Sequence, residues 1–309
     1  MNKLFQLQPL RLMTLLLLLF CLSPAVWAQK RATNRTGSHS VRPRPTMSTA
    51  DRSLVEEAMG VVCTEGKLDP KGSMPIDEMQ ARPSLPVQSS EAIAGAARAE
   101  RLLPFAKDLV ISSLRQLVAD YGFQKSPQYT ARIQRAIARV QTVKKVRPDM
   151  ESRDNASVFL THPHTITFGT IFLAGLPSDE GMISVLAHEL MHIADGDNDL
   201  LYALVKAIAA RASNLTGLEI RGQRSEELVC DLVGAMAVRA FIASTPDYEP
   251  LPRRLARSLE HNCVDLDEGD EDHLSPRSTI RVLLSLNSSL VRELISGRED
   301  HPATRQTPQ

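Results

Sequence analysis

Aromatic residues are scarce in this chain, whose 309 residues include only eight Phe, four Tyr and one Trp. Because strands favour aromatic and β-branched side chains, this scarcity argues against a β-sandwich or barrel and favours a helical core. Net charge is absent as well, since 36 basic residues balance 36 acidic ones. Without a basic excess, we expect no nucleic-acid partner. Four cysteines are too few for a disulfide scaffold in a chain of this length, so a hydrophobic core must stabilise the fold.

Long uncharged apolar runs are missing after residue 28, so no transmembrane helix is expected in the mature chain. Before that point, Lys3 and Arg11 precede an apolar run at 15–22, and small residues at 25–28 follow it. This order is typical of a secretory signal peptide. We therefore predict that residues 1–28 are cleaved and that the protein is exported, either to the periplasm or as a secreted protein. The alternative is an uncleaved signal that keeps the protein associated with the membrane.

Three cysteines remain after such a cleavage: Cys63, Cys230 and Cys263. In an oxidising compartment, two of them are able to pair. Cys230 lies in an apolar helical stretch and is expected to be a small core residue. A Cys63–Cys263 disulfide is therefore predicted. Because spacing does not determine connectivity, two unpaired thiols remain the alternative.

Shifts in composition divide the chain. Residues 29–50 are polar, basic and Pro-containing, as in a flexible linker. Residues 51–297 are expected to form one folded domain with its core at 85–295, and residues 298–309 a disordered tail. Apolar spacing predicts mainly helices, and a β-branched stretch at 143–168 predicts a small mixed or antiparallel sheet, so the fold class is α+β. The expected helices cover 51–62 with an N-cap at Asp51, 89–120 with a kink or break at Pro104, 127–141, 178–195, 197–213, 223–243 and 276–296.

Residues 188–192 read His-Glu-Leu-Met-His, an H-E-x-x-H motif. On a helix, His188 and His192 lie on one face, so both imidazoles can bind a single metal ion. Glu189 lies beside that face, where its carboxylate can take a proton from water that the metal activates. The residues before the motif are apolar with helical spacing, which indicates a buried and rigid helix.

A second pair of polar residues lies in the apolar stretch that follows. Glu227 and Asp231 are four residues apart and share a helical face, where an unpaired charge is costly. A hydrolytic zinc site needs three protein ligands, so one carboxylate can bind the metal while the other orients a ligating imidazole. The alternative is an exposed acidic helix start, which accounts for Glu227 through the helix dipole but not for Asp231.

Together, the H-E-x-x-H motif and the segment from Glu227 to Asp231 resemble the gluzincin zinc metallopeptidases of the HtpX and CAAX prenyl endopeptidase family. That family carries E-x-x-A-D, and Cys230 stands at the Ala position. The resemblance implies a zincin-like metalloprotease domain with one Zn²⁺ per chain. It also implies the following roles: metal ligands His188, His192 and Glu227, catalytic base Glu189, and Asp231 as the partner that orients a ligand.

Weaker similarities extend this resemblance over residues 85–295. Residues 155–159 resemble the family's N-A-F-A segment, which precedes an edge strand. The resemblance therefore implies that Ser157, Val158 and Phe159 hold an extended substrate by β-augmentation.

The C-terminal part of the chain adds two candidate cleft residues. Residues 275–281 resemble the family's H-P-x-x-x-x-R segment, which makes Arg281 a candidate contributor near the active cleft. His273 is a second candidate for stabilising charge in the transition state. Ser275 and Asp197 stand where the family often has His, and neither position belongs to the metal motif.

These motifs predict a zinc-dependent endopeptidase that hydrolyses peptide bonds in polypeptide substrates, with envelope protein quality control as its role by analogy. One alternative is a non-proteolytic, zinc-stabilised binding or chaperone-like protein of the envelope, and another is a hydrolase of non-peptide amides. Glu189 favours catalysis, because a binding module has no need for a general base there. The sequence does not indicate an oligomeric state.

Overall fold

The computed structural model describes residues 47–62, 83–153, 155–159, 161–175, 178–196, 200–245 and 271–296. The predicted signal peptide, most of the predicted linker, the predicted tail and the Cys63–Cys263 pair lie outside these residues. None of the helices described in these segments is both long enough and apolar enough to cross a membrane.

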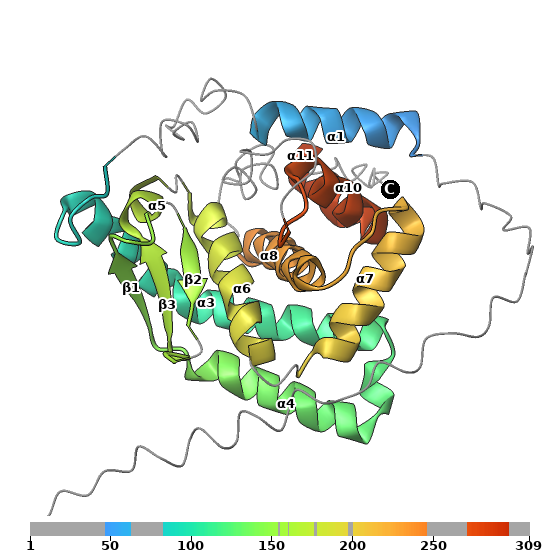
Figure 1. The fold of residues 1–309 in the computed structure, drawn as a ribbon, viewed down its shortest axis with the longest axis horizontal. Helices are drawn as coiled ribbons and strands as arrows, with labels where there is room; N and C mark the ends of the chain where they lie inside the picture. The colour runs from blue at the N-terminus through green and yellow to red at the C-terminus, as the bar shows by residue number, and fades with distance from the viewer. Residues whose placement is uncertain are drawn as a thin grey trace, which may run out of the picture. The chain divides into compact units, whose positions relative to one another are not determined.

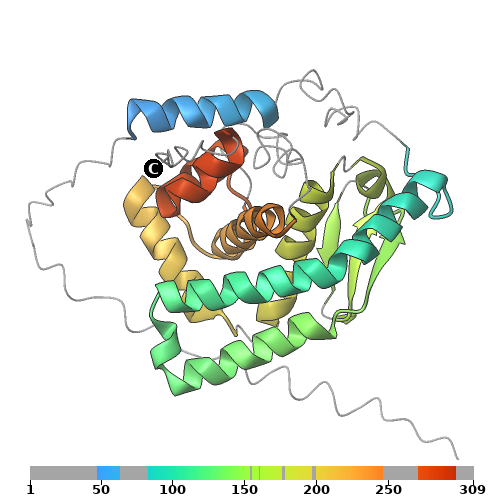
Figure 2. The ribbon, with the colours of Figure 1, turned by 180° about the vertical axis from the view of Figure 1, so that it is seen from behind.

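Helix α3 (Ser90–Asp120) begins where Ser89 accepts a hydrogen bond from the amide of Ala92, a typical N-cap. Its apolar stripe is buried against α5, α6, α8 and strand β1, and in Figure 2 the helix crosses the domain with α4 below it. The predicted break at Pro104 is wrong, because the helix continues through this residue. Pro104 lies on the exposed face, where water can satisfy the carbonyl that loses its partner, while the buried side chains around it hold the helix together.

Helix α6 (Asp179–Asp195) is buried on most of its circumference, as its apolar sequence predicts. It packs against α3, α4 (Pro127–Thr142) and, most extensively, α8 (Gln223–Ser244). Figure 1 shows α6 between the sheet and α8, so that the H-E-x-x-H motif lies in the interior of the domain. The predicted helices at 127–141, 178–195 and 223–243 are confirmed.

The β-branched stretch forms a three-stranded mixed sheet, which confirms the α+β class. Its strands are β1 (Lys145–Asp149), β2 (Ala156–Val158) and β3 (Thr165–Gly169), in the order β1-β3-β2. β1 pairs parallel to β3, and β2 pairs antiparallel to it with Ser157 opposite Thr167. The central strand β3 is buried along its whole length, whereas β2 is an edge strand that contacts α6.

Two parts of the helical pattern differ from the prediction. A short, mainly apolar helix, α5 (Thr170–Gly175), follows β3 directly and was not expected, because six residues are too few for a helical period to be recognised. The single helix expected at 276–296 is two helices, α10 (Pro276–Leu286) and α11 (Ser288–Ser296). Asn287 separates them, and its side-chain oxygen accepts a hydrogen bond from the amide of Leu290. A polar residue that bonds the backbone in this way competes with helix continuation.

The remaining elements complete the helical layer. A short 3₁₀ turn, η1 (Phe123–Lys125), links α3 to α4. Helix α7 (Tyr202–Thr216) begins five residues later than predicted and packs on α8 and α10. Helix α1 (Thr49–Val62) begins two residues before the predicted cap, because Ser48 rather than Asp51 accepts the first amide hydrogen bond. α1 contacts α10 and α11, where Asp51 pairs with Arg292.

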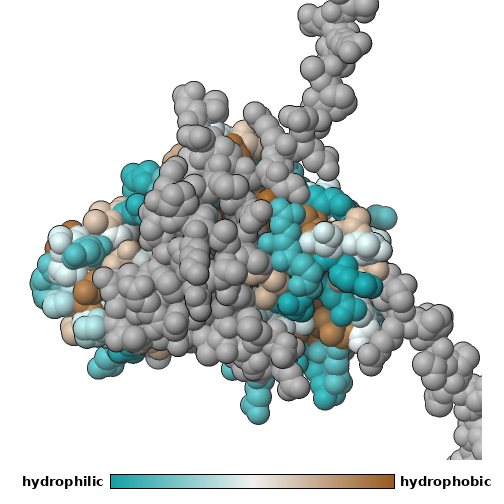
Figure 3. All heavy atoms as spheres, turned by 90° about the horizontal axis from the view of Figure 1, so that it is seen from above, coloured by the Kyte–Doolittle hydropathy of each residue, from teal (hydrophilic) through white to brown (hydrophobic). Residues whose placement is uncertain are grey.

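The visible surface is mixed in character. From above, hydrophilic and apolar residues of the described segments alternate in small areas (Figure 3). The exposed large apolar side chains of the described segments are distributed over α3, α7 and two loops, which is ordinary for a globular domain: Ile93, Phe105, Met150, Phe159, Tyr202 and Leu215.

Candidate metal centre

Helix α6 holds the two histidines of the H-E-x-x-H motif one turn apart. Ser178 caps the start of the helix by accepting a hydrogen bond from the amide of Gly181. At its other end, Gly196 has a positive φ of 60° and donates its amide to the carbonyl of His192. Both imidazoles lie on one side of α6, with ring centroids 5.0 Å apart. The helical period alone produces this proximity.

Helix α8 brings two carboxylates to the same place. Glu227 and Asp231 lie one turn apart on the side of α8 that faces His188. The two helices approach closely one turn beyond the site, where a Cβ atom on Gly234 would lie only 3.1 Å from the carbonyl oxygen of Ser184. The small residue at 234 thus allows the spacing at which side chains of both helices converge.

Three donor atoms from the two helices form a tight triangle. The Nε2 atom of His188 lies 3.0 Å from Oε2 of Glu227 and 3.2 Å from Nε2 of His192. The third side, from His192 Nε2 to Glu227 Oε2, measures 3.4 Å. The structure therefore brings together all three residues that the sequence predicted as metal ligands.

The chemistry of these three atoms favours a cation at the centre of the triangle. Each imidazole nitrogen offers either a proton or a lone pair, and the carboxylate offers only lone pairs. If both nitrogens donate to Glu227, their two protons oppose each other across 3.2 Å. If one nitrogen is deprotonated, its lone pair faces the carboxylate. A metal ion accepts a lone pair from all three atoms at once, so the residues fit a metal ion.

Two further side chains orient these donors. Oδ1 of Asp231 lies 3.0 Å from Nδ1 of His188, and since a carboxylate only accepts, Nδ1 carries the proton. Nε2 is then the nitrogen whose lone pair can bind a metal ion. Asp231 therefore lies where it can orient a ligating imidazole, as the sequence predicted. Gln223 donates from Nε2 to Oε1 of Glu227 at 2.9 Å. Its role was missed in the sequence, although its spacing of four residues from Glu227 was a usable signal.

The electrostatics of the site reflect strong coupling between its groups. Burial alone would raise the pKa of the Glu227 carboxyl, but the imidazoles of His188, His192 and His273 outweigh it and hold that pKa well below its usual range. Burial alone would lower the pKa of the His188 imidazole, but Asp231 and Glu227 outweigh it and raise that pKa well above its usual value. The carboxylates therefore create a field that attracts positive charge to the triangle.

Glu189 lies beside the triangle and does not take part in it. It is buried, lines the same cavity, and its carboxyl has a raised pKa. Desolvation is the largest cause of this shift, and the neighbouring imidazoles of His188 and His192 oppose it. A carboxylate with a raised pKa is a stronger base than an exposed one, which suits it to proton transfer.

Cys230 belongs to the same cluster, which the sequence did not reveal. One donor atom each of His188, His192 and Cys230 lie within 4.8 Å of one another, so these three residues could also hold a metal ion. The thiol is buried, and burial raises its pKa well above the usual value. The triangle with Glu227 is tighter, and its carboxylate needs no deprotonation, so Glu227 is the better third ligand of the two for a zinc-like ion.

A cavity of about 700 Å³ opens beside these residues. Strand β2 borders it with Ala156, Ser157 and Val158, and α6 and α8 border it with the metal cluster. Leu201 and Val205, at the start of α7, add an apolar surface. The cavity thus combines a polar centre, an edge strand and apolar side chains, as binding sites commonly do.

Three other predicted residues lie in different surroundings. His273 lines the cavity, and its Nε2 atom lies 3.5 Å from Oε2 of Glu227. Phe159 follows β2 and is 45% exposed, and the described lining of the cavity includes Val158 but not Phe159. Arg281 is not part of that lining either, and it donates to the carbonyl of Thr216 at the end of α7. Arg281 therefore stabilises a helix terminus in this structure.

Comparisons with family models, curated proteins and solved structures find no match for this chain. The functional argument therefore depends on the geometry and chemistry of the site itself.

Proposed function

We propose that this chain is an exported zinc-dependent endopeptidase with a zincin-like domain, similar to the HtpX and CAAX prenyl endopeptidase family. The observation that carries this proposal is the triangle of His188, His192 and Glu227, with sides of 3.0 to 3.4 Å, beside the buried carboxylate of Glu189. The proposal includes His188, His192 and Glu227 as the ligands of one Zn²⁺ per chain. Polypeptides are its proposed substrates.

The size of the triangle supports zinc. Zinc binds nitrogen and oxygen at about 2.0–2.2 Å with tetrahedral angles, so two such ligands lie about 3.3–3.6 Å apart. The three observed separations fall at or just below this range. Two imidazoles and one carboxylate are also the ligand set of catalytic zinc in several hydrolases, where the fourth position stays open.

The side chains around the triangle have the roles that amide hydrolysis requires. When bound, zinc supplies a Lewis acid that makes water nucleophilic near neutral pH. Glu189 accepts the proton of the attacking water and then delivers it to the leaving amine. Asp231 keeps the His188 ring in one orientation through Nδ1. His273, beside Glu227 at the cavity, is the candidate for stabilising negative charge that develops on the carbonyl oxygen.

The edge strand suits an extended peptide. The amide of Gly169 donates to the carbonyl of Asn155, and the backbone groups of an antiparallel strand alternate in direction. The backbone groups of Ser157 therefore face β3, whereas those of Ala156 and Val158 face the free edge. A substrate strand that pairs with Ala156 and Val158 would lie next to the cavity, which makes a polypeptide a better candidate than a small amide.

The decisive variant is Glu189→Gln, which keeps the shape of the side chain and removes the base. We expect it to retain one zinc ion per chain and to cleave unfolded casein, or the protein itself, about 10²–10⁴-fold more slowly than the wild type. Zinc content is measured by elemental analysis of the purified protein, and cleavage by peptide release with and without a chelator. A matched control is Glu219→Gln, since Glu219 is an exposed acid between α7 and α8.

The two measurements separate the alternatives. Undiminished cleavage by Glu189→Gln would remove the proposed mechanism. A zinc-loaded wild type that cleaves no polypeptide would favour the zinc-stabilised binding role. Cleavage by the wild type that stops with the chelator and returns with added Zn²⁺ supports the peptidase.

A further inference from the structure

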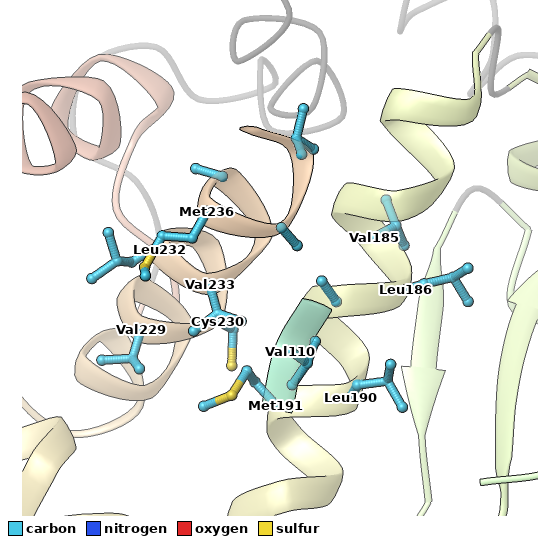
Figure 4. Close-up of a cluster of buried hydrophobic side chains, with 14 of the residues drawn as sticks. Val110, Val185, Leu186, Leu190, Met191, Val229, Cys230, Leu232, Val233 and Met236 are labelled. Atoms are coloured by element: carbon cyan, nitrogen blue, oxygen red, sulfur yellow. The ribbon is translucent and has the colours of Figure 1, made fainter. Parts of the chain in front are cut away.

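Cys230 places a chemically different donor beside the two histidines. Donor atoms of His188, His192 and Cys230 lie within 4.8 Å of one another, and Cys230 is only 3% exposed. It follows Glu227 by three residues on α8, so both side chains lie on neighbouring parts of the helix face turned toward α6. In Figure 4, the Cys230 side chain lies between α8 and α6, in the same region as Met191 and Val110.

The distances between the donor atoms of these three residues are close to those that one bound ion requires. An ion that binds imidazole nitrogen at about 2.1 Å and thiolate sulfur at about 2.3 Å with tetrahedral angles holds the two atoms about 3.6 Å apart. The donor atoms lie within 4.8 Å of one another, so a sulfur at that limit must move by about one ångström. The single side-chain torsion of Cys230 can move the sulfur without a change in the backbone.

We propose that His188, His192 and Cys230 form a second ligand set, for a thiophilic cation such as Cd²⁺ or Cu⁺, which overlaps the set made with Glu227. Thiolate sulfur selects soft cations, whereas carboxylate oxygen prefers harder ones, so the two sets differ in preference. Because both sets use the same two imidazoles, the soft cation and zinc exclude each other. The proposal does not depend on peptidase activity, since it concerns the binding of metal ions alone.

Binding in this set exchanges a proton for the cation. The thiol of Cys230 loses its proton to solvent, a bond forms between sulfur and the cation, and no oxidation state changes. Cys230 lines the cavity, through which the proton can leave, and it also belongs to the hydrophobic core of the domain. The Glu227 carboxylate remains next to the cation and balances part of its charge.

The test is a titration of the purified, metal-free protein with Cd²⁺ alone, followed by the ultraviolet absorbance of the thiolate-to-cadmium charge transfer. We expect this band to saturate at one equivalent per chain and to decrease when Zn²⁺ competes. Cys230→Ala should abolish the band and weaken Cd²⁺ binding by at least about tenfold, since even the loss of an outer partner of a metal ligand costs about 10–100-fold. The same variant should still bind one Zn²⁺.

Two control variants isolate the ligands. Glu227→Gln should keep the cadmium band and lose zinc binding, the opposite pattern to Cys230→Ala. A triple variant with Cys21, Cys63 and Cys263 changed to Ser leaves Cys230 as the one cysteine of the four in the chain, and it should keep the band. Circular dichroism checks that each variant is folded, and Cys230→Ser replaces Cys230→Ala if the latter is not.

Three results would overturn the proposal. An absent band in the wild type at one equivalent shows that Cys230 does not bind the cation. A band that persists in the Cys230 variant, or disappears in the triple variant, assigns the sulfur to another cysteine. A band that disappears in Glu227→Gln shows a single ligand set rather than two.

Discussion

The α6–α8 helix pair and the β2 edge of the sheet border the same cavity, but they are built in opposite ways. The helix pair is long and buried, and it holds three donor atoms within 3.4 Å of one another. Strand β2 has three residues, two of them only partly buried, and it ends next to the exposed Phe159. A metal ion needs side chains held at short distances, whereas an extended peptide needs only free backbone groups. In the proposed peptidase, stability and metal binding would therefore depend on the helix pair, and peptide binding on the edge strand.

The largest expected difference between the two regions is in folding stability. Leu190→Ala, at a fully buried position of α6, should lower the free energy of unfolding by about 2–5 kcal/mol, because it leaves a cavity between packed helices. Phe159→Ala, beside the edge strand, should change it by less than about 0.5 kcal/mol, because the ring is already exposed. Urea denaturation of both variants measures the contrast. Equal losses would contradict the comparison.

A change in the distance between α6 and α8 should have the next largest effect on stability and metal binding. A Cβ atom on Gly234 would lie 3.1 Å from the carbonyl oxygen and 3.2 Å from the hydroxyl oxygen of Ser184. Gly234→Val should therefore cost about 1–3 kcal/mol of stability through overpacking and should weaken metal binding as the helices separate. Adding Ser184→Gly removes the hydroxyl and should restore part of the lost stability and part of the lost metal affinity. Denaturation measures the stability, and a zinc competition assay measures the metal affinity. If Gly234→Val changes neither quantity, α6 and α8 are not tightly packed at Gly234.

Asp231→Asn removes one negative charge from the helix pair and leaves the size of the side chain unchanged. The amide keeps a hydrogen-bonding oxygen toward Nδ1 of His188 but loses the negative charge. Zinc affinity should fall by about 10–100-fold, as for other partners that orient a metal ligand, with little change in stability. Competition with a chromophoric chelator measures the affinity. An unchanged affinity would leave Asp231 with a purely structural role.

The smallest expected effect concerns the edge strand and appears only in peptide cleavage. Val158→Pro removes an amide that faces the free edge, which an edge strand tolerates. The protein should stay folded, and kcat/KM for a peptide substrate should fall by about fivefold, because one backbone hydrogen bond contributes about 1 kcal/mol. Ser157→Pro is the matched control, since its amide faces β3 and its loss should destabilise the sheet instead. Equal kinetics in wild type and Val158→Pro would argue against strand pairing by the substrate.

Local patterns predicted much of this molecule because they depend on residues close in sequence. The four-residue spacing of His188 and His192 and the apolar stretch before it are sufficient to predict a buried helix with two convergent imidazoles. The β-branched stretch likewise predicted a small sheet. The apolar pattern was wrong at two points for different reasons. α3 continues through Pro104 because packing on both sides of it compensates for one lost hydrogen bond. α10 ends before Asn287 because the side chain of Asn287 bonds the backbone of Leu290, a local signal that the apolar pattern does not include.

The candidate site divides in the same way. The sequence by itself determined which side chains share a helix face, because a helix places residues four apart one above the other. It also determined that Glu227 and Asp231 need partners, since charges in an apolar stretch are costly. Only the tertiary structure decided that these carboxylates meet His188 and His192, that Cys230 lies within reach of the same histidines, and that Arg281 lies at the end of α7 instead of the cavity. These contacts join residues at least 35 positions apart, and their distances follow from how closely the helices pack, which no local period specifies.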